Sequence, residues 1–418
     1  MKEKNLNPGD YVKLQTKERE WQGIILESYK PSIILLKLDS GYNIGIREES
    51  ILNLKIIKKT SKQENQKPKI KQNKQLPNIA MIITGGTISS RLDPKTGGVI
   101  STDAEEILKI APEISKICNI TKIEKPFMKM SENMSFKDWK KLASLCKTLL
   151  DKEDIDGIIL THGTDFLHYT SAALSYYLTP NKPIALTYSQ RSIDRGSTDA
   201  HLNLICAAKY ACSDIAEIAI IGHKNLNDNK CLAMPGTKTR KMHTSRRDTF
   251  KVINSQPIAE ISKQGFKILQ EFNARSSKKT KINAKYTDKV ALIKIYPGQA
   301  PDILEWYAKQ GYKGLVLELT GLGHTPGKGA MKNWIPVIKR LIKSGIIIVG
   351  APQTLYGRLN PNVYSNGREL QKTGLIFLED MLPETAFIKL SWILAHKWPA
   401  EKMLKPIARD ISNKLEIK

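Results

Sequence analysis

The chain has 418 residues and 41% of them are hydrophobic, which suffices for two or three domains with ordinary cores and excludes a wholly disordered chain. Its formal net charge of +25 indicates a polyanionic partner such as a nucleic acid, or else an ordinary surface solvated by lysines; both interpretations stay open. No signal-peptide core or long uncharged apolar segment is found, so we expect a cytosolic protein without a membrane span.

Residues 1–57 have the pattern of a small all-β module. Short strand candidates and a hairpin turn at residues 39–41 indicate a partly open barrel of the SH3 or OB kind. Its strand candidates are residues 11–14, 21–28, 32–38 and 42–46. Residues 58–77 then carry many lysines between Gln and Asn and no aliphatic periodicity, which predicts a solvated linker.

From Ile79 onward, apolar strand patterns alternate with helix patterns, which is typical of an α/β fold with a mostly parallel sheet and covering helices. In residues 78–272 we expect strands at 79–83, 157–160, 184–187 and 215–221, and helices at 103–117, 135–150, 166–178 and 199–211. Residues 273–289 are basic and poor in apolar residues, so we interpret them as a weakly ordered connector. A second, smaller α/β unit is predicted at 290–418, with strands at 290–296, 314–319 and 346–350 and helices at 300–310, 331–344 and 384–396.

Cysteine and histidine usage argues against a metal site. The cysteines form no CxxC pair and lie mostly in apolar segments, so free buried thiols in a reducing compartment are expected. The histidines share no ligand spacing, and residues 326–329 (PGKG) lack the full spacing of a phosphate-binding loop. We therefore expect no metal and no nucleotide cofactor in this chain.

Two strand ends carry the most informative residues. The apolar run at residues 79–83 stops at Thr84-Gly-Gly-Thr87, and the run at 157–160 stops at Thr161-His-Gly-Thr-Asp165. Glycines allow a tight turn with exposed amides, and open α/β sheets form their ligand crevice at the carboxyl ends of the strands. Two hydroxyls and a carboxylate are thus expected to converge on one crevice.

This pair of motifs is similar to the paired signatures of the L-asparaginase/glutaminase family. Residues 131–134 (SENM), 367–370 (GREL) and 381–385 (MLPET) also resemble segments of that family, so the likeness runs from about residue 78 to the C-terminus. With the β module in front, the whole chain resembles the D-subunit family of archaeal glutamyl-tRNA(Gln) amidotransferases (GatD).

The resemblance implies a two-domain asparaginase-like body and a threonine nucleophile. Thr87 would attack the side-chain amide of glutamine and form an acyl-enzyme. Thr164, Asp165 and Lys241 correspond to the family's second catalytic set, in which the lysine lowers the cost of ionising Thr164. Asp165 would orient that lysine or hold the substrate α-amino group, and which threonine attacks first stays open.

Substrate binding is assigned by the same resemblance. Ser131 and Glu132 would hold the α-carboxylate and α-amino groups of glutamine, and Gly86 would contribute its exposed backbone. One departure concerns the loop after Thr87, where the family commonly supplies a tyrosine. No tyrosine occurs between Thr84 and Tyr169, so another group activates Thr87 or a partner completes the loop.

The predicted function is a glutaminase subunit that supplies ammonia for converting Glu-tRNA(Gln) to Gln-tRNA(Gln). ATP and Mg²⁺ would belong to a GatE-type partner subunit, which would also make most tRNA contacts, and a homodimer within a heterotetramer is expected. The alternatives are a free-standing L-asparaginase with an accessory barrel and a non-catalytic tRNA-binding scaffold.

Overall fold

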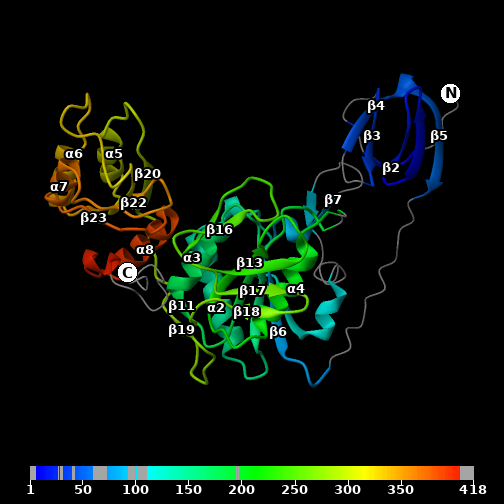
Figure 1. Cartoon of the computed structure of the whole chain (residues 1–418), viewed down its shortest axis with the longest axis horizontal. Helices are drawn as coiled ribbons and strands as arrows, with labels where there is room; N and C mark the ends of the chain where they lie inside the picture. Colours follow the sequence, from blue (N-terminus) through cyan, green and yellow to red (C-terminus); the bar gives the residue numbers. More distant parts are fainter. Residues whose placement is uncertain are drawn as a thin grey trace.

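The computed structural model describes residues 6–26, 28, 32–39, 43–59, 73–92, 99–101, 111–193, 195 and 197–404. Figure 1 shows the N-terminal sheet and the C-terminal unit on opposite sides of a larger central body. Within these ranges, every helix is too short or too polar to span a lipid bilayer.

The N-terminal module is a five-stranded antiparallel sheet of order β4-β3-β2-β1-β5 (Figure 1). It encloses a small core whose buried members include Val12, Leu14 and Leu36. The predicted β module is thus confirmed, although its fifth strand is not among the predicted ones because most of that strand's residues are exposed. The strands are β1 (Tyr11–Thr16), β2 (Glu20–Leu26), β3 (Ile33–Leu38), β4 (Asn43–Arg47) and β5 (Ile51–Lys58).

The central body is built on an eight-stranded sheet of order β18-β17-β14-β13-β12-β10-β6-β9. The five strands from β13 to β9 are parallel, and β14, β17 and β18 continue the sheet with antiparallel pairings. The strands are β6 (Asn78–Ile83), β9 (Asn119–Glu124), β10 (Gly157–Thr161), β12 (Ile184–Thr187), β13 (Ile218–His223), β14 (Lys230–Pro235), β17 (Ala259–Ser262) and β18 (Phe266–Ile268).

Helices cover both faces of this sheet, which explains the unbroken apolar run of β6. Ala80 and Ile82 face a core formed with α2 (Phe136–Leu150) and α3 (Leu167–Tyr177). Ile79, Met81 and Ile83 point to the other core, which contains α4 (Ala200–Ala211). The predicted α/β architecture is therefore confirmed.

The C-terminal unit is a four-stranded parallel sheet of order β20-β21-β22-β23. Its strands are β20 (Val290–Lys294), β21 (Gly314–Leu319), β22 (Ile347–Pro352) and β23 (Ile376–Phe377), and its helices are α5 (Asp302–Lys309), α6 (Ile335–Lys343), α7 (Ser365–Gln371) and α8 (Pro383–Ala395). Residues of α8 share one core with Val316 and Val349 of this sheet and with Ala173 and Tyr177 of α3. Helix α8 thereby joins the two units, and Figure 1 shows it between them.

Two predicted segments need comment. The helix expected at 103–117 falls largely on residues outside the described ranges, and Pro112–Lys116 is a 3₁₀ helix. The weak order predicted for residues 273–289 is wrong: β19 (Lys281–Ile282) pairs with β11 (Leu178–Thr179). Arg275 also donates to the carbonyls of Ser213, Asp156 and Ala211. Hydrogen bonds, together with the packing of Ile282, Ala284 and Tyr286 against the core, therefore order a segment that has few apolar residues.

Candidate active site at the ends of two parallel strands

The two sequence motifs lie side by side because β6 and β10 are neighbouring parallel strands. Their register pairs Ile83 with Thr161, so both chains leave the sheet at the same edge. The Thr84 hydroxyl donates to the Thr161 carbonyl at 2.9 Å, and the Thr84 amide donates to the same oxygen at 3.2 Å. These bonds hold the two motifs together where each strand ends.

The glycines allow the two loops to touch. Gly86 has a φ of +80°, and a Cβ placed there would lie 2.3 Å from the Cα of Gly163. Gly85 has a φ of +111°, and its Cβ would lie 2.4 Å from the carbonyl oxygen of Lys129. Only glycine combines these backbone conformations with such close approach. The residues that follow, Thr87 and Thr164, therefore lie on loops that are in contact.

Lys241 brings a cation to the second motif. It lies at the end of the short hairpin strand β15 (Thr239–Lys241), which pairs with β16 (Phe250–Val252). Its Nζ donates to the Thr164 hydroxyl at 2.8 Å and to the Asp165 carboxylate at 2.7 Å. The lysine side chain is 14% exposed and the aspartate side chain 58% exposed. A largely desolvated ammonium beside a hydroxyl lowers the free energy of the corresponding alkoxide, so this trio can assist proton removal from a threonine.

Thr87 is placed differently. It is half-buried at the start of the 3₁₀ helix Thr87–Ser89, and its hydroxyl has no hydrogen-bond partner among the residues that the structure describes. Residues 93–98 of the loop that follows lie outside those residues. Tyr169, the next tyrosine along the chain, packs against Phe166 and His168. The role of Thr87 as nucleophile and the group that would accept its proton both stay predictions.

The predicted substrate loop reaches the same place. Ser131 is 1% exposed, and its hydroxyl accepts a hydrogen bond from the Phe166 amide at 3.2 Å. A Cβ on Gly163 would lie 2.9 Å from that hydroxyl oxygen, so Ser131 packs against the second motif. Glu132 is exposed beside it. The structure therefore brings this loop to the crevice, and the binding roles of Ser131 and Glu132 stay predictions.

His162 shapes the backbone of the second motif. The Trp139 Nε1–H donates to the Thr170 hydroxyl at 2.8 Å, and that hydroxyl lies 2.8 Å from His162 Nε2. The Thr170 hydroxyl can therefore donate its own proton to His162 Nε2. The neutral imidazole then carries its proton on Nδ1, which donates to the Gly163 carbonyl at 2.7 Å. Burial lowers the pKa of His162 to about 4. A neutral, fully buried ring explains a structural role for this residue.

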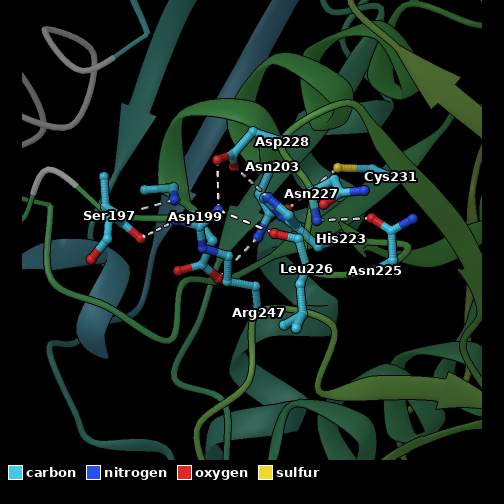
Figure 2. Close-up of polar contacts among 12 residues, drawn as sticks. Ser197, Asp199, Asn203, His223, Asn225, Leu226, Asn227, Asp228, Cys231 and Arg247 are labelled. Carbon is cyan, nitrogen blue, oxygen red and sulfur yellow. Dashed lines mark hydrogen bonds and ion pairs between the residues drawn. The ribbon is translucent and has the colours of Figure 1, made fainter.

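A polar network that sequence patterns did not reveal joins three loops of the central body (Figure 2). The two ring nitrogens of His223 lie 2.7 Å from Asn203 Oδ1 and 2.8 Å from Asp228 Oδ1. Arg247, in the loop between β15 and β16, donates to Asp228 and to the Ser197 carbonyl at 2.9 Å. The network thus ties the loop after Lys241 to the loops that follow β12 and β13. The one sequence feature that could have pointed to this network is the position of His223 at the end of strand β13.

Metal chemistry has no evident support here. In the described ranges, no three His, Cys, Asp or Glu side chains are grouped so that they would hold a metal ion. All five cysteines are free, and four of them are buried. The groups that Lys241 brings together are the Thr164 hydroxyl, the Asp165 carboxylate and its own ammonium.

Comparisons with known protein families and structures identify the domains of the chain. Residues 78–274 match the N-terminal asparaginase domain, residues 289–405 the C-terminal glutaminase/asparaginase domain, and residues 6–57 the GatD N-terminal domain. The solved L-asparaginase of Thermococcus kodakarensis superposes with a TM-score of 0.70 at 27% identity, covering 80% of this chain and 98% of that enzyme. L-asparaginase I of Vibrio cholerae gives 0.67 at 26% identity, with the same coverage.

Full-length relatives narrow the family further. The chain is 43% identical over 409 residues to the glutamyl-tRNA(Gln) amidotransferase D-subunit of Thermococcus kodakarensis, covering 95% of this chain and 91% of the relative. It is 44% identical to the corresponding D-subunit of Pyrococcus furiosus, covering 95% and 92%. The chain therefore belongs to the D-subunit family of glutamyl-tRNA(Gln) amidotransferases, within the asparaginase/glutaminase fold.

Proposed function

We propose that this chain is the glutaminase subunit of a tRNA-dependent amidotransferase. It would hydrolyse the side-chain amide of glutamine and supply the ammonia that converts Glu-tRNA(Gln) to Gln-tRNA(Gln). The observation that carries the proposal is the contact of Lys241 with Thr164 and Asp165, in a motif whose Gly163 packs against Gly86, the residue before Thr87. Relatives that carry the D-subunit name and match almost the whole chain support it.

The reaction has two halves. The Thr87 oxygen attacks the amide carbon of glutamine and gives up its proton, and the tetrahedral intermediate expels ammonia after its nitrogen gains a proton. The resulting ester on Thr87 is then hydrolysed by water, which releases glutamate and restores the hydroxyl. Lys241 stabilises the ionised oxygen of Thr164, which relays protons, and Asp165 orients the lysine. The alternative order, in which Thr164 attacks first, uses the same residues.

Substrate specificity is proposed to come from the loop beside the second motif. Ser131 would hold the α-carboxylate of glutamine through its hydroxyl, and Glu132 would pair with the α-amino group. The exposed carboxylate of Asp165 is a further candidate for that ammonium group. The backbone of Gly86 would contact the amide end, since no side chain intervenes there.

The chain is proposed to act with partners in the cytoplasm. A GatE-type subunit would bind ATP and Mg²⁺ and hold most of the tRNA, and this chain would need no cofactor. For the assembled enzyme we propose a homodimer within a heterotetramer.

A free-standing L-asparaginase is the second candidate. The Thermococcus kodakarensis L-asparaginase aligns over 98% of its own length, so the body of this chain lacks nothing of that fold. The substrates separate the two functions, because an asparaginase would turn over asparagine without a partner.

The test measures ammonia release from glutamine and from asparagine by the chain alone and with the partner subunit and Glu-tRNA(Gln). We expect glutamine to be preferred and its turnover to rise in the complex. Variants T87A, T164A and K241A should each abolish release while the purified chain stays folded. Full activity in all three would refute the proposed site and leave a non-catalytic scaffold as the better explanation.

A further inference from the structure

Two of the five cysteines lie together where helix α4 ends beside the start of strand β9. Cys212 caps the C-terminus of α4, and Cys118 comes directly before β9. The Cys212 Sγ lies 3.9 Å from the carbonyl oxygen of Ile117, the residue before Cys118, and a hydrogen bond joins the two thiols. Both residues pack in one core cluster of the central body. Two thiols that are far apart in the chain are thus in contact.

This junction lies at the amino edge of the parallel strands, opposite the edge that carries the two motifs. A Cβ on Gly157, the first residue of β10, would lie 2.3 Å from the carbonyl oxygen of Ala211. The end of α4 therefore touches the beginning of β10, whereas Thr161 of the second motif is the last residue of that strand. A chemical change at the two cysteines acts on the scaffold and leaves the groups around Lys241 in place.

The two thiols differ in access and in their surroundings. Cys118 is 2% exposed, whereas Cys212 is half-buried. Arg275 lies beside Cys212: its Nε donates to the Ser213 carbonyl at 2.6 Å and its Nη2 to the Ala211 carbonyl at 3.1 Å. A guanidinium bound to both neighbours of a cysteine favours the thiolate of that cysteine over the thiol.

The hydrogen bond between the thiols gives each of them a different role. It lowers the pKa of Cys212, and the positive charge of Arg275 acts in the same direction, against burial and the nearby Asp156. The same bond, together with burial, raises the pKa of Cys118. Cys118 is therefore the S–H donor and Cys212 the acceptor that carries the negative charge. A partly exposed thiolate is the form of cysteine that reacts with oxidants.

A second pair of cysteines in the same core cluster provides the comparison. Cys206 and Cys231 are both 0% exposed. Their thiols donate to the Ile261 carbonyl at 3.6 Å and to Asn203 Oδ1 at 3.4 Å. Burial, followed by the hydrogen bond to Cys206, raises the pKa of Cys231 well above its ordinary value. This pair is closed to solvent and its Cys231 stays protonated, so it should be inert toward the same oxidants.

We propose that Cys118 and Cys212 are a redox modification site, which a peroxide converts into a disulfide that fastens α4 to the start of β9. The Cys212 thiolate attacks one oxygen of hydrogen peroxide, the O–O bond breaks, and a sulfenic acid forms while hydroxide leaves and takes up a proton. The Cys118 sulfur then attacks the Cys212 sulfur, and the S–O bond breaks with release of water. Two thiols are thus oxidised, one peroxide is reduced to two waters, and a dithiol reductant reverses the change.

The consequence for the chain is greater stability. A bond between these residues closes a loop that runs from β9 to the end of α4, and closing a long loop reduces the conformational entropy of the unfolded chain. The oxidised chain should therefore melt about 5 °C or more above the reduced chain. The inference does not depend on the proposed glutaminase function, because the reagents act on thiols at the other edge of the sheet.

The first experiment uses the unaltered full chain. The reduced protein is treated with hydrogen peroxide at about pH 7, unfolded in N-ethylmaleimide to block the remaining thiols, and mapped by peptide mass spectrometry without reduction. We expect a cross-linked peptide pair that contains Cys118 and Cys212, with Cys146, Cys206 and Cys231 recovered as maleimide adducts. Dithiothreitol should remove the cross-link. Oxidation that spares Cys212, or a Cys206–Cys231 cross-link that forms as fast, would overturn the inference.

Three variants separate the two chemical steps. C212S should form no cross-link, and C118S should stop at a Cys212 sulfenic acid that dimedone traps. The matched control C206S should cross-link at the rate of the unaltered chain. Thermal unfolding is then measured with and without peroxide. A cross-linked chain that melts no higher than the reduced chain, or an equal shift of the melting temperature in C212S, would contradict the proposed fastening of α4 to β9.

Discussion

Replacement of Lys241 by Met tests the part of the site that is best defined. The substitution keeps a long side chain and removes the hydrogen bonds to Thr164 at 2.8 Å and to Asp165 at 2.7 Å. The ion pair that is lost involves a carboxylate with 58% exposure, so it contributes at most about 1 kcal/mol to stability. Proton-transfer assistance by a positioned side chain contributes about 10²- to 10⁴-fold to the rate. K241M should therefore lose most of its activity and little of its stability.

The assay measures ammonia release from glutamine in the complex, together with denaturant unfolding of the isolated chain. We expect kcat to fall by about 10²-fold or more, with a change in unfolding free energy below about 1 kcal/mol. The control is K267M, the same substitution at an exposed strand residue remote from both motifs in the sequence. An activity loss under about 5-fold would refute the role of the lysine, because it is far below the range for a proton-transfer group.

Three further predictions concern the scaffold of the site. G86A should lower the unfolding free energy by about 1–3 kcal/mol from backbone strain, and by a further amount because its Cβ would lie 2.3 Å from the Cα of Gly163. The control G298A measures the strain alone, because Gly298 has a φ of +76° and open space around it. Equal losses of stability in the two variants would contradict the close contact at Gly86. Because burial lowers the pKa of His162 to about 4 from an ordinary 6.5, the folded state binds this proton less tightly, so stability should fall as pH drops from about 6.5 to about 4, by up to about 3 kcal/mol. Denaturant unfolding across that range should give a shallower slope for H162Q, and an identical slope would show that His162 does not titrate in this way. K238M leaves the buried carboxylate of Asp380 unpaired and should cost about 3–5 kcal/mol in thermal or denaturant unfolding, whereas a loss below about 1 kcal/mol would show that water reaches the pair.

The sequence was most informative where local pattern and tertiary structure coincide. The strand Asn78–Ile83 is buried on both faces, and its unbroken apolar run indicated this directly. The strand Gly314–Leu319 was predicted with the observed bounds, and all its residues except Glu318 are buried. The two motifs were expected at one edge because parallel strands end together, and the contact of Gly86 with Gly163 shows that they do. Lys241 was found by family resemblance, since nothing local distinguishes it from neighbouring basic residues.

The remaining features depend on residues that are far apart in the chain. Arg240 and Glu384 meet only because α8 packs against the central body, and no hydrophobic periodicity in the sequence predicts that contact. The network of His223, Asp228 and Arg247 joins three loops, which no single segment could indicate. The antiparallel extension of the large sheet was missed because β17 and β18 have only four and three residues, and the burial of β14 does not alternate along its length. The order of residues 273–289 comes from hydrogen bonds, which hydrophobic patterns do not report.

Ammonia release from glutamine, measured for the chain alone and then with its partner subunit and Glu-tRNA(Gln), tests the central claim most directly. We expect turnover of glutamine that rises sharply in the complex and disappears in T87A, T164A and K241A. Partner-independent turnover of asparagine in preference to glutamine would contradict the claim and make the chain an asparaginase with an accessory barrel. Retention of activity in the three variants would contradict the site itself.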